Sequence, residues 1–380
     1  MTAPAGNETS ASPLSPTRTT KRYNRIKLGL SILSSVLSLA FLIALMASGA
    51  SRAIAVKVCR VTASPYLGLL YFAAVIVVVQ SLLTFPVSFI SGFIVEHRYN
   101  LSNQSIGRWA WEKLKGALIG APIGIVILLV LYYCMREWGR LWWLPVAAIL
   151  SFFSFVLARL APTLILPLFY KLTPLEDGPL KKAIFLQCAR AGLRVNGIFQ
   201  FNLSKNTKKA NAAFTGIGKA RRVILGDTLV NEFTPEEVET VFAHELGHYK
   251  FKHIHVGMAV GIVSTFVGLY ITSILHAWSL PRFGVFSILD YTGLPLLGLW
   301  LALFGIVTSP LGNILSRYHE RQADRFAVTA TGKPAAFVSA LRKLASMNLA
   351  DPEPHPLVEF LFYSHPSIGK RIRLVESQGV

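Results

Sequence analysis

The residues best suited to chemistry are two histidines and a glutamate in the run VFAHELGH at 241–248. Their spacing is that of an HExxH motif, in which two imidazoles one helical turn apart can bind one Zn²⁺. Glu245 would lie beside His244 and His248 without being a ligand, placed to take a proton from a zinc-bound water. The run therefore predicts hydrolytic chemistry at a single metal ion, and the alternative is two solvated histidines on a surface helix.

The residues before this motif carry the signals of a helix start. Thr234 can cap the helix, Pro235 suits its first turn, and Glu237 completes a capping box. On a helix that begins here, both imidazoles point to the same side. The sequence thus predicts the element that must carry the first two ligands.

A catalytic zinc takes three protein ligands and keeps one position open for water. Glu320 and Asp324 are also one helical turn apart, so one can bind the metal while the other accepts a hydrogen bond from a ligand imidazole. We interpret Glu320 as the third ligand and rank His319 below it, because no partner at helical spacing supports His319. Without a metal, Glu320 would be a surface carboxylate paired with Arg317 or Arg321.

The elements that must position these groups are membrane helices. The chain of 380 residues is 53% hydrophobic and only 15% charged, against about 25% charged for a typical soluble domain. This composition excludes a soluble cytosolic enzyme and a disordered tail. Six windows are long and apolar enough to span a bilayer and contain no charged residue. They are 28–46, 66–85, 117–134, 141–158, 256–275 and 293–311.

The net charge of +19 is explained by membrane orientation. With a cytoplasmic N-terminus, 31 of the 38 Lys and Arg fall on the cytoplasmic side, as the positive-inside rule requires. No nucleic-acid-binding module accompanies the charge, so we expect a lipid bilayer and no nucleic acid as partner. The metal site and both termini are predicted to be cytoplasmic.

The windows divide the chain into five parts. We expect a disordered N-terminal tail, four membrane helices with their loops, a cytoplasmic-side segment with the metal helix, two further membrane helices, and a cytoplasmic-side segment with the third ligand. These parts are 1–20, 21–168, 169–255, 256–311 and 312–380.

Further blocks of sequence lie at 85–99, 167–175, 211–214, 222–229 and 365–371. Together with the HExxH helix, these blocks resemble the integral-membrane zinc metalloproteases of the CAAX prenyl protease type 1 family, also called Ste24-type peptidases of peptidase family M48. The early block with Glu96-His97-Arg98 argues against the shorter HtpX-type proteases, which share the zinc motif. The alternative to a functional role for Glu96 and Arg98 is a structural ion pair at the membrane surface.

The runs at 211–214 and 223–225 are apolar or β-prone and separated by glycines, which predicts a small β-hairpin. By resemblance, the edge of this hairpin pairs with an extended peptide, and Asn211 and Ala212 contact the substrate main chain. On turn chemistry alone, Asn211 is an ordinary turn-forming asparagine.

The resemblance also assigns roles near the C-terminus. It implies that His365 hydrogen-bonds the developing oxyanion and that Arg371 anchors its segment or pairs with a buried acid. Without the resemblance, His365 is a loop histidine before proline.

The sequence therefore predicts a mainly α, polytopic membrane protein with about six transmembrane helices, a gluzincin-like site holding one Zn²⁺ per chain, and a small β-hairpin. The resemblance implies a metalloendopeptidase that removes the C-terminal tripeptide of prenylated proteins. The alternatives are a general membrane quality-control protease without prenyl specificity, and an idle scaffold or transporter with structural zinc. Two features depart from the family: eukaryotic members have seven spans, and the run at 201–206 differs from theirs, which concerns substrate preference.

Overall fold

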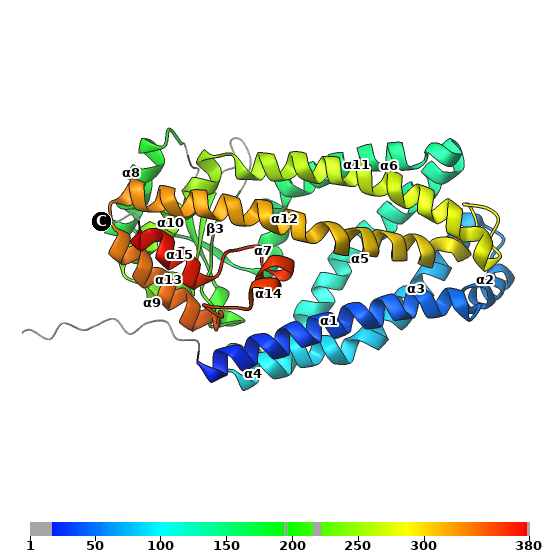
Figure 1. The fold of residues 1–380 in the computed structure, drawn as a ribbon, viewed down its shortest axis with the longest axis horizontal. Helices are drawn as coiled ribbons and strands as arrows, with labels where there is room; N and C mark the ends of the chain where they lie inside the picture. Colours follow the sequence, from blue (N-terminus) through cyan, green and yellow to red (C-terminus); the bar gives the residue numbers. More distant parts are fainter. Residues whose placement is uncertain (1–16, 194, 196, 216–221, 378–380) are drawn as a thin grey trace, which may run out of the picture.

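The computed structural model describes residues 17–193, 195, 197–215 and 222–377. Long helices run between one end that carries a small sheet and an opposite end that carries the short helix α2 (Figure 1). The helices of the first half are α1 (Arg18–Ala47), α2 (Ala50–Val61), α3 (Pro65–Phe89), α4 (Val95–Arg98), α5 (Ile106–Trp138), α6 (Trp143–Leu160), α7 (Leu166–Phe169) and α8 (Pro179–Arg190). Those of the second half are α9 (Asp227–Glu232), α10 (Pro235–Lys250), α11 (His253–Ser279), α12 (Leu294–Thr331), α13 (Pro334–Asn348), α14 (Pro356–Phe362) and α15 (Ile368–Glu376).

Six helical stretches are long and apolar enough to cross a membrane; five of them contain a predicted window whole, and the fourth begins two residues after the start of its window, 141–158. They are Arg18–Ala47, Pro65–Arg98, Ile106–Leu141, Trp143–Phe169, His253–Phe283 and Tyr291–Thr331. The predicted count of six is confirmed for the described residues. Helix α1 begins at Arg18, capped by Thr17, so it starts inside the predicted tail; residues 1–16 of that tail lie outside the described residues.

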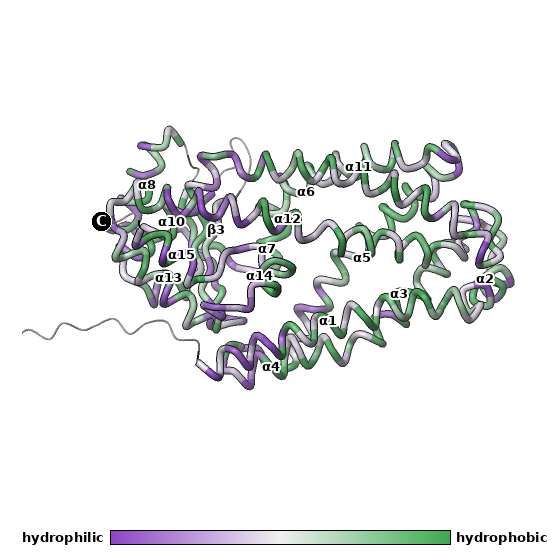
Figure 2. The backbone as a smooth tube through the Cα atoms, viewed as in Figure 1, coloured by the Kyte–Doolittle hydropathy of each residue, from purple (hydrophilic) through white to green (hydrophobic). Residues whose placement is uncertain are grey.

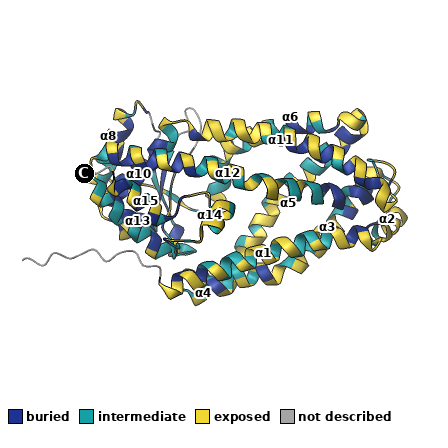
Figure 3. Cartoon of the chain, viewed as in Figure 1, coloured by how far each residue is buried: buried dark blue, intermediate teal, exposed yellow. Residues whose placement is uncertain are grey.

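The long helices consist largely of hydrophobic residues (Figure 2), and many residues along them are exposed (Figure 3). Leu82 is 68% exposed, Phe152 70% and Val307 74%. Apolar patches of this extent are unfavourable in water but match a hydrocarbon surrounding. Exposed apolar side chains, which would destabilise a soluble protein, are therefore expected in this membrane protein.

A four-stranded sheet lies at one end of the molecule, in the order β1 (Leu172–Pro174), β2 (Ile198–Phe201), β4 (Arg222–Gly226) and β3 (Ala212–Thr215). Strands β3 and β4 are antiparallel, with Ala212 opposite Leu225, which confirms the pairing predicted for the hairpin; its turn lies outside the described residues. Strands β1 and β2 were not predicted, because runs this short lack an alternating pattern. Strand β3 is an edge of the sheet.

Helix α10 lies between the sheet and the C-terminal helices. One of its faces presents Val238, Phe242 and Leu246 to the hydrophobic cluster of the sheet. On its other side, Ala243 packs with a second cluster that includes Phe337 and residues of α12 and α15. The helix with the HExxH motif is thus buried on both sides, which fixes its rotation.

Candidate metal centre and active site

The start of α10 is held by the predicted capping box. The Thr234 hydroxyl accepts a hydrogen bond from the Glu237 N–H at 3.3 Å, and the Glu237 carboxylate accepts one from the Thr234 N–H at 2.8 Å. Lys343 and Ser339 of α13 also donate to Glu237, at 2.7 and 2.6 Å. The helix start is therefore tied to the C-terminal segment as well as capped.

Close packing brings α10 against α12. A Cβ atom at Gly247 would lie 3.0 Å from the Cα of Ala323 and 3.1 Å from the Phe326 ring. Only glycine allows the two backbones this approach. The imidazoles of His244 and His248 consequently face the carboxylate of Glu320.

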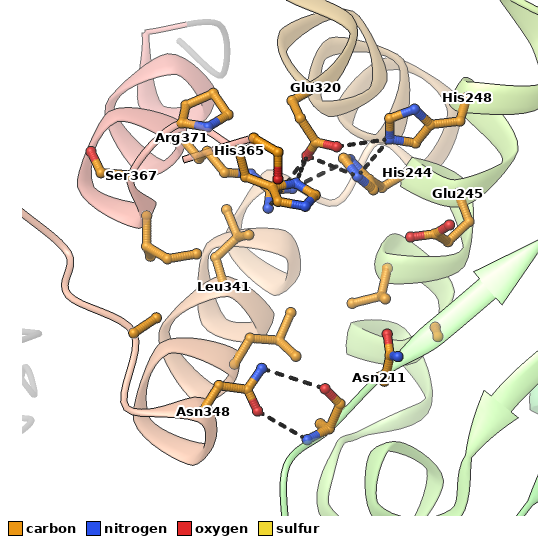
Figure 4. A pocket seen from close by; sticks show the side chains of 18 of the residues that line it. Asn211, His244, Glu245, His248, Glu320, Leu341, Asn348, His365, Ser367 and Arg371 are labelled. Atoms are coloured by element: carbon orange, nitrogen blue, oxygen red, sulfur yellow. Dashed lines mark hydrogen bonds and ion pairs between the residues drawn. The ribbon is translucent and has the colours of Figure 1, made fainter. Parts of the chain in front are cut away.

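The ligand atoms of His244, His248 and Glu320 all lie within 4.8 Å of one another (Figure 4). The two Nε2 atoms are 3.2 Å apart, and they lie 3.4 and 3.2 Å from the nearest Glu320 oxygens. Four ligands at about 2.0 to 2.1 Å around a tetrahedral zinc would be separated by roughly 3.3 Å. Two imidazoles and one carboxylate are also a donor set of catalytic zinc sites, so the three residues fit such a metal in both spacing and chemistry.

The other nitrogen of His244 is engaged by a buried carboxylate. Asp324, with no exposed surface, places Oδ1 2.8 Å from His244 Nδ1. When Nδ1 donates this hydrogen bond, Nε2 of the neutral ring presents its lone pair toward His248 and Glu320. Arg371 donates to both oxygens of Asp324, at 2.9 and 2.6 Å, so the buried acid is itself paired.

Two further observations point to a cation at this position. Glu320 Oε2 is buried and accepts no hydrogen bond of good geometry from the described residues, although His365 Nδ1 lies 3.0 Å away. Burial alone would lower the pKa of His244, but the nearby carboxylates of Asp324 and Glu320 raise it to about 9. The two carboxylates therefore attract positive charge to the His244 imidazole, and a divalent metal would compete with the proton for its ring nitrogen.

A cavity of about 790 Å³ opens in front of this cluster and is lined by Asn211, Ala212, His244, Glu245, His248, Glu320, Asn348, His365 and Arg371, among others. Glu245 extends from α10 into this space, and Asn211 lies below it in the view, on the same side of the pocket (Figure 4). His365 enters from the loop before α15, with 62% of its side chain exposed. Every site residue predicted from the sequence except Asp324 lines this one cavity, and Asp324 lies behind His244.

Contacts behind His248 were missed in the sequence. His253 Nδ1 lies 3.0 Å from His248 Nδ1, and His253 Nε2 lies 2.9 Å from the Gln322 amide oxygen. The ring of His319, the competing ligand candidate, stacks on His253 at 4.0 Å and is not among the described residues whose ligand atoms converge. The sequence signal for this contact was His253, five residues after His248. A straight helix would not bring two residues at this spacing together.

The expected pair of Glu96 with Arg98 is wrong. Glu96 forms ion pairs of 2.9 Å with both Lys27 and Lys209 and accepts a hydrogen bond from the Tyr23 hydroxyl. Residues two apart on a helix point to different sides, so Arg98 cannot share the face of Glu96. The carboxylate instead joins α1 to the segment that leads into β3.

An HExxH helix facing a carboxylate helix, carried by six apolar helices, defines a membrane-embedded metalloprotease. The sequence profile described as peptidase family M48 matches residues 174–378. A second profile, described as the CAAX prenyl protease N-terminal region with five membrane helices, matches residues 13–171. The chain belongs to peptidase family M48 and is an integral, multi-pass membrane protein.

Several known proteins are similar over most of their length. The uncharacterized metalloprotease YhfN of Bacillus subtilis is 29% identical over 94% of this chain and 85% of its own. CAAX prenyl protease 1 of Saccharomyces cerevisiae is 30% identical over 81% of this chain and 72% of its own. The crystal structure of S. mikatae Ste24p superposes with a TM-score of 0.85 at 25% identity, covering 94% of this chain and 88% of that one. The protein is a membrane metalloprotease that resembles CAAX prenyl protease 1.

Proposed function

We propose that the protein is a zinc endopeptidase that cleaves near the carboxyl terminus of prenylated, membrane-associated proteins. The observation that carries the hydrolytic part is the convergence of His244, His248 and Glu320 within 4.8 Å in a cavity that Glu245 also lines. The prenylated substrate is supported by the similarity to the yeast protein named CAAX prenyl protease 1.

A zinc ion bound by His244, His248 and Glu320 would polarise the scissile carbonyl and lower the pKa of a water molecule. Glu245 accepts the proton of the attacking water and delivers it to the leaving amine. Asp324 holds His244 in the tautomer that leaves Nε2 free for the metal. Asp324 keeps its charge because Arg371 pairs with it.

The remaining site residues would act on the substrate. The main chain of Ala212 and the side chain of Asn211 hold an extended peptide along the edge of β3. His365 reaches the cavity from the opposite wall and donates a hydrogen bond to the oxyanion. The side chains that hold the peptide and those that activate water thus come from different segments.

We also propose the five-part division at 1–20, 21–168, 169–255, 256–311 and 312–380, with the third and fifth parts forming one catalytic unit. That unit lies at the same end of the molecule as the start of α1 and helix α4 (Figure 1). Because 31 of the 38 Lys and Arg belong to segments of this end, we place it and both termini in the cytoplasm. Thiol labelling in sealed vesicles tests this orientation, with a single cysteine placed in α8 or in α2 of a variant that lacks Cys59, Cys134 and Cys188.

The function is tested with two matched peptides that end in a Cys-a-a-X sequence, one prenylated and one not, incubated with the purified zinc-loaded protein. We expect preferential cleavage of the prenylated peptide, and no cleavage by Glu245→Gln, which keeps its metal. Equal cleavage of both peptides would instead support a general quality-control protease. A protein that binds zinc and cleaves neither would support an idle scaffold or transporter and contradict the proposal.

A further inference from the structure

The free edge of β3 has a defined pattern of hydrogen-bonding groups. Gly226 N–H donates to the carbonyl of Asn211 at 2.9 Å, which makes Asn211 and Gly226 a hydrogen-bonded pair of the antiparallel β3–β4 ladder. Because such pairs alternate along an antiparallel ladder, the residues on either side of Asn211 direct their N–H and C=O groups outward. Ala210 and Ala212 therefore face away from the sheet, toward the position of an added strand.

The outward groups of Ala210 are occupied by a side chain. The carboxamide of Asn348 accepts a hydrogen bond from the Ala210 N–H at 3.1 Å and donates one to the Ala210 carbonyl at 3.4 Å (Figure 4). One amide thus makes both hydrogen bonds that a neighbouring strand would make at this residue. An added strand cannot pair with Ala210 while Asn348 is in place.

The edge that leads into β3 is also covered by other segments at the residues before Ala210. Lys208, the next outward residue, donates its N–H to the Leu101 carbonyl at 3.0 Å, and Ser102 forms a β-bridge with Thr207. In the other direction, within the described residues, the outward groups of Ala212 have no such partner outside the sheet. Within the part of the chain that the structure describes, the edge is therefore closed before Ala212 and open at Ala212.

The position of Asn348 is itself fixed. It is the last residue of α13 and is followed by Leu349 in a left-handed conformation with φ of 47°. The carbonyl of Leu349 accepts a hydrogen bond from the Asn24 amide of α1 at 2.7 Å. The carboxamide is therefore held from both the catalytic segment and the first membrane helix.

We infer that Asn348 is a specificity-determining residue, which ends the substrate-binding edge at Ala210 and so limits how many residues a bound peptide can extend on one side of the scissile bond. Ala210 lies two residues from Ala212, so the open edge ends roughly 7 Å beyond it. This inference rests on the proposed function, in which the substrate is cut near its carboxyl terminus. We therefore assign the closed side to the residues that follow the scissile bond.

The test uses two series of fluorogenic peptides cut at one bond, lengthened one residue at a time on the carboxyl side or on the amino side. For the wild-type protein we expect kcat/KM to fall about tenfold once the carboxyl side passes its limit, because the added residue meets the Asn348 carboxamide and leaves buried hydrogen-bonding groups without partners. Amino-side extension should leave kcat/KM nearly unchanged. Asn348→Ala and the isosteric Asn348→Leu should remove the fall, measured within each variant as the ratio of kcat/KM for the longest and the shortest peptide.

Asn202→Ala is the matched control, because the Asn202 carboxamide also holds a main-chain group, the Lys171 N–H at 2.8 Å, but next to β1 at the opposite side of the sheet. This control should keep the wild-type length limit. If both Asn348 variants bind zinc and cleave the shortest peptide but keep that limit, or if the limit lies on the amino side, the inference is overturned. If the wild-type protein cleaves no peptide at all, it is the proposed function that fails.

Discussion

The two halves of helix α12 place apolar and charged side chains in opposite surroundings. In its first half, Ile306 is 52% exposed and Val307 74% exposed. In its second half, Glu320 is 3% exposed and Asp324 fully buried. One continuous helix is thus apolar outside along the membrane and charged inside at the catalytic end.

The difference shows what each surrounding demands. Hydrocarbon accepts apolar side chains on the outside of a helix without penalty. A buried carboxylate is tolerated only where partners converge on it, and Asp324 has Arg371 and His244 as such partners. The catalytic half of α12 is therefore stabilised by ion pairs and hydrogen bonds between named side chains. The membrane half is stabilised by the surrounding hydrocarbon.

The largest effect on the catalytic half of α12 is expected when Arg371, which pairs with the buried Asp324 carboxylate, is replaced. Arg371→Leu leaves Asp324 buried and without its arginine, which should lower the free energy of unfolding by about 3–5 kcal/mol. Thermal unfolding in detergent measures this. Arg373→Leu is the control, because Arg373 is 61% exposed in its pair with Glu353 and should change stability little; equal effects of both variants would contradict the network.

A charge on the membrane half should also be costly. Val307→Lys places an ammonium in hydrocarbon, at a cost of about 2.5–3.5 kcal/mol near the centre of a span. We expect less protein integrated into the membrane, measured as the fraction resistant to alkaline extraction, with Val307→Leu as the control. Normal integration of the lysine variant would show that this face of α12 does not contact lipid.

Asp324→Asn should weaken the metal site without removing a ligand. Loss of the carboxylate that orients a ligand imidazole typically lowers metal affinity about 10–100-fold. Competition with a chelator measures the zinc Kd. Asp177→Asn is the control, since Asp177 is exposed in its pair with Lys181, and an unchanged Kd for Asp324→Asn would contradict the role of Asp324.

The smallest effect concerns the start of α10 and depends on pH. Burial alone would raise the pKa of Glu237, but hydrogen bonds from Lys343, Ser339 and the Thr234 N–H outweigh it and lower the pKa below the ordinary 4.5. A lowered pKa in the folded state stabilises the protein at pH values above the ordinary pKa of 4.5, and this contribution is lost as the pH falls through the folded pKa. Glu237→Gln should therefore cost about 1 kcal/mol at neutral pH and progressively less below pH 4.5.

Unfolding temperatures between neutral and acid pH measure this difference, with the exposed neighbour Glu236 replaced by glutamine as the control. A gap between wild type and Glu237→Gln that stays constant with falling pH would contradict the predicted contribution of the carboxylate.

Local features of the site were predictable from the sequence. The cap at Thr234 and the spacing of His244 and His248 lie within one helix, so periodicity alone places them. The six windows follow from length and hydropathy. Glu320 could be proposed because two crossings return the chain to the side of α10.

Features that depend on contacts between distant segments were not predictable. Asn348 reaches Ala210 across 138 positions of sequence, and Lys209 reaches Glu96 from another segment altogether. Local spacing gives no information on such pairs, so Glu96 was given the wrong partner. Strand β2 was not predicted from the sequence for a related reason, because its four residues form a strand only by pairing with β4.

The central claim is that α10 and α12 together hold one zinc ion, and the zinc content of two neighbouring variants tests it most directly. Purified Glu320→Ala and His319→Ala are dialysed against the same low zinc concentration, and bound metal is measured per chain. The account predicts that His319→Ala retains one zinc and Glu320→Ala loses it. Wild-type zinc in Glu320→Ala, with loss from His319→Ala, would contradict it.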